Sequence, residues 1–367
     1  MKNIIRNMAL AALALPLAMS LSAASEHPKR QDAALEKSHP ILMLTEESVV
    51  EMREAAGSVP RFDAAVAQLI AEADAAVERE LCVPVPKDGG GGYTHEVHKQ
   101  NYYDMYNCGV AWQLTGDERY AEKTKEIMYA YAEMYPGLGY HPLGLSSVPG
   151  KIFWQTLNES VWLVHTSVAY DCIRDWLTEK DRRHLEKNLF RPMAEFIMDG
   201  TPDNRANNVT FNKMHNHGTW ATAAVGMMAI AMDDDDLLDK ALYGSDETGK
   251  NGGFIMQLDR LFSPDGYFTE GAYYQRYAIW PFVTFAQCID HYRPELEIFS
   301  YRDGIIVKAV EALLQMAYDG EFFRFNDALE KGYDAQELIY AVDIAYNADR
   351  SRKDLLSIAR DSQDRVL

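Results

Sequence analysis

Apolar residues recur at three- and four-residue spacing along most of the chain, which is the periodicity of amphipathic α-helices. No segment alternates apolar and polar residues convincingly at period two. Thr115 with Glu118, and Thr178 with Asp181, have the spacing of capping boxes and predict helix starts. Helices are predicted at 49–58, 62–80, 104–116, 119–135, 157–177, 219–232, 252–262, 272–292, 304–318 and 335–346.

This succession of helical hairpins, mostly joined by short polar turns, predicts an all-α fold. About a dozen helices would form six pairs, which close an (α/α)6 toroid, and no fixed repeat length favours a superhelical array instead. Two longer segments rich in Gly, Pro, His and Tyr, 87–101 and 136–151, are predicted as functional loops.

The first 24 residues are typical of a secretory signal peptide. Lys2 and Arg6 precede an apolar run and a cluster of small residues, and the run is too short for a membrane anchor. We therefore expect residues 25–367 to form one mature domain. That domain would be periplasmic or secreted, without association with a membrane.

The chain is strongly acidic, with a net charge of −19. Proteins that bind nucleic acid need a basic face to neutralise phosphates, so nucleic acid is excluded as a partner. An acidic chain also repels polyanionic ligands, unless cations gather locally in the binding cleft. The oligomeric state has no signature in the sequence.

The ligand spacing argues against a metal. His215 and His217 are two residues apart and would point to different sides of a helix, whereas helical metal motifs use residues four apart. The four cysteines lie far apart in sequence, which favours free, buried thiols over a zinc site. We expect neither a metal nor another cofactor.

Two segments concentrate reactive side chains, 211–221 around His-Asn-His and 263–278 around a cluster of tyrosines. A structural interpretation lets Asn216 cap a helix and Arg276 pair with Glu270. On the helix that begins in the second segment, Tyr273 and Trp280 are assigned to the core. Tyr274 falls on a different helical side and is the better functional candidate, because nearby His and Arg side chains would favour its phenolate.

The order of three segments resembles that of the family-17 polysaccharide lyases, the oligoalginate lyases, within the heparinase II/III-like group. These segments are 150–162, 212–221 and 263–278. The resemblance implies an (α/α)6 toroid and an alginate or related uronate oligosaccharide as substrate. It also implies that the chain lacks the C-terminal β-sandwich usual in the family and is incomplete without it.

Residue by residue, the resemblance implies that Asn216 and His217 bind the substrate carboxylate and that Tyr274 is the general acid and base. Lys151 and Arg276 match substrate-binding cations, and Tyr277 matches a residue that lines the cleft. A lyase removes the C5 proton of a uronate, and neutralising the adjacent carboxylate stabilises the enolate-like transition state.

Two alternatives stay open from the sequence. A glycoside hydrolase on the same toroid needs two carboxylates that flank the scissile bond, and Asp265 and Glu270, with Asp171 or Glu159, are available. A non-catalytic uronate-binding remnant would retain the cleft without turnover.

Overall fold

The computed structural model describes residues 37–200, 210–325 and 328–361, so the predicted signal peptide lies outside the described residues. The elements of the described part are almost all helices. They are α1 (Glu46–Ala55), α2 (Pro60–Glu78), α3 (Tyr93–Thr115), α4 (Glu118–Met134), η1 (Tyr135–Gly137), α5 (Thr156–Ile173), α6 (Glu179–Leu185), η2 (Glu186–Phe190), α7 (Arg191–Asp199), α9 (Asn216–Ala231), α10 (Asp235–Tyr243), α11 (Phe254–Arg260), α12 (Ala272–Tyr292), η3 (Pro294–Leu296), α13 (Tyr301–Gln315), β1 (Ala317–Tyr318), β2 (Glu321–Phe322), α14 (Gln336–Ala348) and α15 (Leu356–Asp361).

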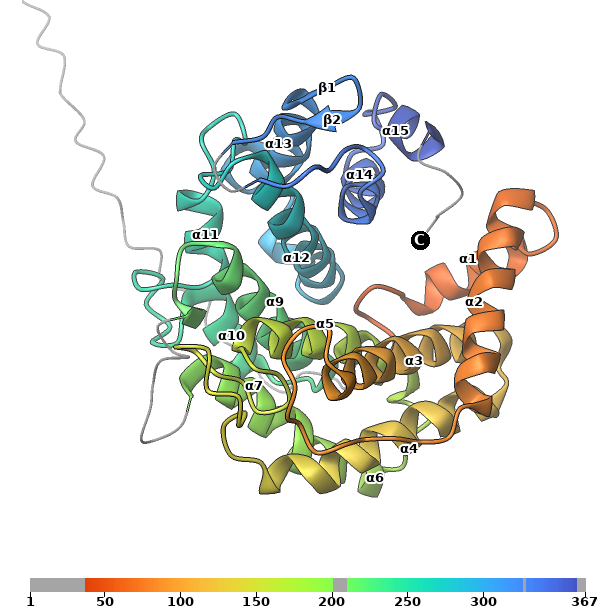
Figure 1. The fold of residues 1–367 in the computed structure, drawn as a ribbon. Coiled ribbons are helices and arrows are strands. Elements are labelled where there is room, and N and C mark those ends of the chain that lie inside the picture. The colour runs from red at the N-terminus through yellow and green to blue at the C-terminus, as the bar shows by residue number, and fades with distance from the viewer. Residues whose placement is uncertain (1–36, 201–209, 326–327, 362–367) are drawn as a thin grey trace, which may run out of the picture. The chain divides into compact units, whose positions relative to one another are not determined.

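Five helices follow one another as an inner layer. Helix α3 packs on α5, α5 on α9, α9 on α12, and α12 on α14 (Figure 1). The other helices form a second layer, with α2 and α4 against α3, α7 and α10 against α9, and α13 against α12 and α14. Two layers of successive helical hairpins make an α/α toroid, so the predicted fold class is confirmed.

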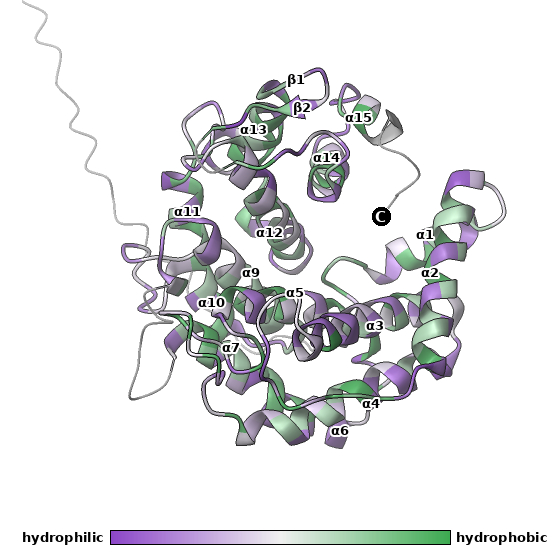
Figure 2. Ribbon diagram, in the orientation of Figure 1, coloured by the Kyte–Doolittle hydropathy of each residue, from purple (hydrophilic) through white to green (hydrophobic). Residues whose placement is uncertain are grey.

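Composition explains which helices lie in the inner layer. Helix α9 is apolar or small on every side and is buried from Gly218 to Ala231, as expected of a helix with neighbours all round. A Cβ atom on Gly226 would lie 2.0 Å from the Phe285 ring, so this glycine lets α9 approach α12 closely. Figure 2 shows mixed hydrophilic and hydrophobic residues along α2 and α4, which belong to the second layer. Among the described residues, no helix combines the length and apolarity needed to cross a bilayer.

The prediction of a loop over 87–101 is partly wrong, because α3 already begins at Tyr93. Its first turns bury His95 and His98, and the His98 Nδ1 atom lies 2.7 Å from the Tyr131 hydroxyl oxygen of α4. Contacts with residues distant in sequence therefore stabilise the first turns of α3, which directly follow a glycine-rich segment. The second predicted loop is confirmed beyond η1, since residues 138–155 contain no helix or strand.

The predicted helix caps have different outcomes. Thr178 and Asp181 form the expected capping box at the start of α6. The prediction for Thr115 is wrong: its hydroxyl donates to the Ala111 carbonyl at 2.7 Å, and Asp117 caps α4 instead.

A two-stranded hairpin is present where helix was predicted to continue to residue 318. Strands β1 and β2 pair antiparallel around Asp319 and Gly320, which have φ angles of 52° and 80°. Asp-Gly is the preferred dipeptide for a tight hairpin turn with positive φ at both residues.

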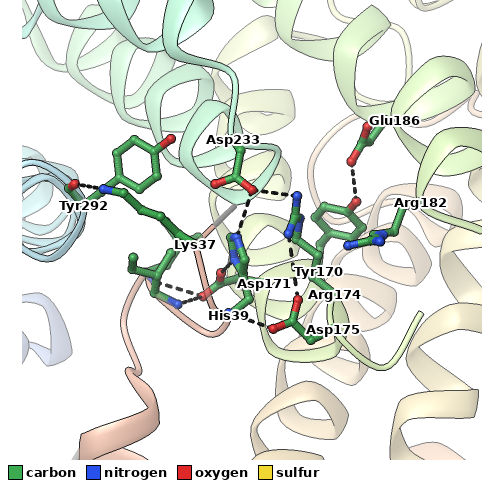
Figure 3. Close-up of polar contacts among 12 residues, drawn as sticks. Lys37, His39, Tyr170, Asp171, Arg174, Asp175, Arg182, Glu186, Asp233 and Tyr292 are labelled. Carbon is green, nitrogen blue, oxygen red and sulfur yellow. Dashed lines mark hydrogen bonds and ion pairs between the residues drawn. The ribbon is translucent and has the colours of Figure 1, made fainter. Parts of the chain in front are cut away.

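An N-terminal segment, residues 37–42, is bonded to the ends of the inner helices α5 and α12 and to Asp233, just after α9 (Figure 3). The His39 Nδ1 atom lies 2.5 Å from Asp171 of α5, and its Nε2 atom lies 3.4 Å from Asp233, just after α9. The other Asp171 oxygen accepts the backbone N–H groups of Ile41 and Leu42 at 2.9 and 2.8 Å. Asp171 therefore binds residues 39–42 to the inner layer of helices.

Cysteine usage agrees with the prediction of free thiols. None of the four forms a disulfide, and Cys108, Cys172 and Cys288 are buried. Cys82 is exposed, which corrects the expectation that all four are buried.

Candidate active site

The start of α9 is capped by a histidine. The His215 Nδ1 atom accepts the backbone N–H of His217 at 3.0 Å. The interpretation of Asn216 as the cap is therefore wrong, and Asn216 is instead the first residue of the helix. One ring nitrogen of His215 accepts this backbone hydrogen bond, so the ring stabilises the start of the helix.

Asn216 is held by Glu270, which lies 54 residues further along the chain. Its backbone N–H donates to Glu270 Oε1 at 2.8 Å, and its side-chain Nδ2 donates to Glu270 Oε2 at 2.6 Å. Glu270 stands just before α12, so these bonds bring the two predicted segments together. Asn216 is only 5% exposed.

His217 is half-buried next to Asn216. Its ring meets the His215 ring edge-on, with centroids 4.9 Å apart. Burial, and then the positive charge of Lys213, lower the pKa of His217 below its ordinary value. The ring is therefore neutral at neutral pH and offers a hydrogen bond rather than a full charge, until a carboxylate binds beside it.

Helix α12 carries Tyr274, Arg276 and Tyr277. Tyr274 is half-buried, and its ring stands at 88° to the Tyr273 ring at 5.2 Å. Arg276 is 5% exposed and forms an ion pair with Glu337 of α14, with its guanidinium carbon 4.9 Å from the centre of the Tyr273 ring. The proposed Arg276–Glu270 pair is therefore wrong, because Glu270 binds Asn216.

Aromatic packing joins α12 to α9 near these residues. The Tyr277 ring lies 5.3 Å from the Trp220 ring, and Trp280 meets Trp220 at 5.5 Å. Burial raises the pKa of Tyr277 well above its ordinary value, so its phenol stays protonated and can donate a hydrogen bond. Trp280 packs against the core, as the sequence predicts.

Lys151 lies in the segment that precedes α5. Its ammonium group sits over the rings of Tyr135 and Phe196, at 4.7 and 5.1 Å from their centroids. Burial lowers the pKa of Lys151, while the charge of Glu159 opposes this effect. Within the described residues, no contact joins the Lys151 side chain to α9 or α12, so the structure does not place it against Asn216.

Glu159 fixes the backbone that presents Lys151. This fully buried carboxyl accepts the N–H groups of Lys151, Ile152 and Phe153 at 2.8, 3.1 and 3.3 Å. A Cβ atom on Gly150 would lie 2.4 Å from the same oxygen, so only glycine fits there. Burial raises the pKa of Glu159 to about 7, against the opposing effect of these N–H donors.

We expect Glu159→Gln to lower the free energy of unfolding by about 1–3 kcal/mol, because a neutral amide oxygen accepts the three buried N–H groups more weakly than the carboxylate oxygen does. The loosened segment should also weaken binding of uronate oligomers through Lys151. Urea unfolding and titration calorimetry with alginate oligomers measure the two effects. Glu133→Gln, on the exposed face of α4, is the matched control and should change stability by less than about 0.5 kcal/mol. Unchanged stability and binding in Glu159→Gln would contradict this role.

The carboxylates proposed for hydrolysis are engaged elsewhere. Glu159 holds backbone N–H groups, and Asp171 holds the N-terminal segment. Glu270 binds Asn216, and the Asp265 carboxylate accepts the Ser263 hydroxyl within its own turn. A hydrolase needs one carboxylic acid and one free carboxylate across the scissile bond, and these side chains do not present such a pair.

Two residues of the site were not predicted from the sequence in their observed roles. Glu270 was noticed as a partner for Arg276, and Glu337 was not singled out. Their partners lie in other helices, and nothing in local spacing indicates them. Among the described residues, no cluster of three His, Cys, Asp or Glu side chains has a geometry that could hold a metal ion.

Comparison with known proteins identifies the family of this chain. The sequence profile of the alginate lyase family matches residues 87–323, well over half of the chain. The chain belongs to the alginate lyase family. The match includes the starts of both α9 and α12, where Asn216 and Tyr274 lie.

Two curated relatives are similar over most of this chain. An exo-oligoalginate lyase of Saccharophagus degradans is 47% identical over 88% of this chain and 43% of its own length. An alginate lyase of Stenotrophomonas maltophilia is 44% identical over 97% of this chain and 47% of its own length. The chain thus spans less than half the length of either relative.

A solved structure supports the fold. The crystal structure of an alginate lyase from Bacteroides ovatus matches with a TM-score of 0.61, covering 89% of this chain and 97% of that one. Its sequence is only 14% identical, so this likeness concerns the fold.

Proposed function

We propose that this protein is a polysaccharide lyase that cleaves alginate, or a related uronate oligomer, by β-elimination. The observation that carries the proposal is the pair of bonds between Glu270 and Asn216. They join the start of α9, with Asn216 and His217, to the turn that leads into Tyr274. Amide and imidazole donors near a phenol are the groups that this elimination needs.

In the proposed reaction, Asn216 and His217 donate hydrogen bonds to the carboxylate on C5 of the uronate. Negative charge spreads onto that carboxylate as the C5 proton leaves, so these donors stabilise the transition state more than the ground state. Tyr274, as the phenolate, takes the C5 proton. The C4–O4 bond then breaks, a C4–C5 double bond forms, and Tyr274 returns the proton to O4.

The remaining predicted residues are proposed to bind the substrate. Arg276 stands two residues from Tyr274 on α12 and pairs with Glu337, and its proposed role is to bind the uronate. Tyr277 offers a protonated phenol along the same helix, and Lys151 attracts a more distant uronate of the oligomer. Together these cations allow an acidic protein to bind a polyanion.

The product distinguishes this proposal from its alternatives. Elimination leaves a double bond conjugated with the carboxylate, so the product absorbs ultraviolet light, whereas hydrolysis leaves a saturated sugar. Purified protein incubated with alginate oligomers should release unsaturated uronates, identified by absorbance and mass spectrometry. Saturated products would indicate a hydrolase, and binding without any product would indicate a uronate-binding protein; either result would overturn the proposal.

We expect His217→Ala to lower kcat by about 10²- to 10³-fold, as does the loss of one donor to a developing oxyanion. Its effect on stability should be small, because the ring is only half-buried. Initial rates of product absorbance and the melting temperature measure the two effects. His184→Ala removes a histidine that stacks on Tyr129 and is the matched control. A large drop in melting temperature with normal kcat would contradict this role of His217.

A chelator separates this role from a metal site at the same histidines. Since the proposed donors act directly on the carboxylate, dialysis against a strong chelator should leave the rate unchanged. Loss of activity that zinc restores would instead favour metal ligation by His215 and His217.

We also propose that the protein is exported to the periplasm or beyond the cell, because residues 1–24 have the pattern of a signal peptide. The mass of the protein recovered from the periplasmic fraction tests this point. A chain recovered there without its first residues would support export, and an intact chain in the cytoplasm would argue against it.

A further inference from the structure

The turn that carries Glu270 is firmly held. The side chain of Gln275, which is fully buried, accepts the Phe268 N–H at 3.1 Å and donates to the carbonyls of Gly266 and Ala309, both at 2.8 Å. The Gly271 N–H donates to the Phe268 carbonyl at 3.0 Å. The backbone on both sides of Glu270 is therefore fixed by hydrogen bonds, which gives its side chain a defined origin.

Both carboxylate oxygens of Glu270 accept hydrogen bonds from the same residue, Asn216. Oε1 accepts the Asn216 backbone N–H, and Oε2 accepts the Asn216 side-chain N–H. If the Asn216 amide were turned over, its carbonyl oxygen would face Oε2 and the two acceptors would repel each other. The carboxylate thus selects one orientation of the amide.

Helix capping explains only half of this contact. His215 already accepts the N–H of His217, and the Oε1 bond satisfies the N–H of Asn216 itself. A carboxylate near the start of a helix is also favourable to the helix dipole. The second bond, from Nδ2 to Oε2, does nothing for the backbone of α9. It acts on the amide group alone.

We propose that Glu270 is a positioning residue that orients the Asn216 amide for the substrate carboxylate. With one N–H engaged by Oε2, the second N–H is directed away from Glu270 and is available to the carboxylate. Because Glu270 extends from the turn just before α12, it also fixes the spacing between this donor and Tyr274. This inference rests on the proposed lyase function.

A double-mutant cycle tests the assignment. Glu270→Gln retains an acceptor for one N–H but places an NH₂ group or a weaker acceptor against Nδ2. We expect kcat on alginate oligomers to fall by about 10- to 100-fold, the usual effect of losing a hydrogen bond to a charged group, with little change in KM. Because Glu270 acts through Asn216, Glu270→Gln should cause no further loss in an Asn216→Ala background.

The matched control is Asp234→Asn. Asp234 also stands at a helix start, where it accepts the Leu237 N–H of α10 at 3.0 Å and pairs with Arg191. This variant should lose stability without losing kcat. Multiplicative losses in the cycle, or an equal loss of kcat in Asp234→Asn, would overturn the positioning role.

A spectroscopic measurement keeps this inference separate from the proposed function. In unliganded protein labelled with ¹⁵N-asparagine, the side-chain amide signal of Asn216 is assigned by its absence in Asn216→Ala. Glu270→Gln should shift that signal, whether or not the protein turns over alginate. A shifted signal in a protein without lyase activity would refute the function and leave the contact intact. An unchanged signal would overturn the inference itself.

Discussion

Tyr274→Phe is expected to lower the rate of elimination by about 10²- to 10⁴-fold, the range that general acid–base groups contribute. The substitution keeps the half-buried ring and its packing against Tyr273 and removes only the oxygen that transfers the proton. Binding of alginate oligomers should persist, since Asn216 and His217 are untouched. Single-turnover rates from product absorbance, together with calorimetric binding, measure both expectations.

Tyr273→Phe provides the matched control for this experiment. The Tyr273 ring lies beside Arg276 and Tyr274, and a phenylalanine ring preserves these contacts. Its rate should stay within a few-fold of the wild type. If Tyr274→Phe retained near-normal turnover, Tyr274 would be a packing residue and the proposed proton transfer would be wrong.

Asp171→Ala is expected to have the largest effect on stability, about 3–5 kcal/mol, which is typical of breaking a buried ion pair from one side. It leaves His39 without its closest carboxylate and leaves the N–H groups of Ile41 and Leu42 without an acceptor (Figure 3). Urea unfolding followed by circular dichroism measures the loss. Asp175→Ala is the control, because Asp175 is 47% exposed and accepts only the His39 N–H in this segment. It should cost less than about 1 kcal/mol.

The same contact predicts how stability depends on pH. Burial opposes the charged form of His39, but hydrogen bonds to Asp171 and Asp233 raise its pKa to about 9. A raised pKa means that the folded state holds the proton more tightly, so its contribution is complete below the unfolded value of about 6.5. It is lost as pH rises through about 9. In Asp171→Ala the fall between these pH values should be much smaller, and a flat profile in the wild type would contradict a protonated His39.

Carboxylates hold several of the site residues in place. Asn216 is held by Glu270 and Arg276 by Glu337, while Glu159 anchors the segment of Lys151. These negative partners reduce the positive potential around the site residues. In return they hold flexible side chains in one arrangement before substrate binds, which lowers the entropy lost on binding.

Local patterns in the sequence were sufficient to predict the helical class of this protein and most of its helices. Spacing of apolar residues is a local property, and it identified α2, α4, α5, α9 and α12 because each buries one side or its whole circumference. The Asp-Gly dipeptide at 319–320 was missed as a hairpin turn, because the helical pattern before it concealed the strands. The two reactive segments were likewise visible as unusual clusters of His, Asn, Tyr and Arg.

The pairing of side chains from different helices, in contrast, depends on how the helices pack. The sequence suggested that Arg276 pairs with Glu270, six residues away, but Glu270 binds Asn216 of α9 and Arg276 binds Glu337 of α14. The start of α3 at Tyr93 depended in the same way on contacts between His98 and distant α4. The spacing of apolar residues predicts which face of a helix is buried. It does not predict which residues of other helices contact that face, because those contacts depend on the packing of helices that are distant in sequence.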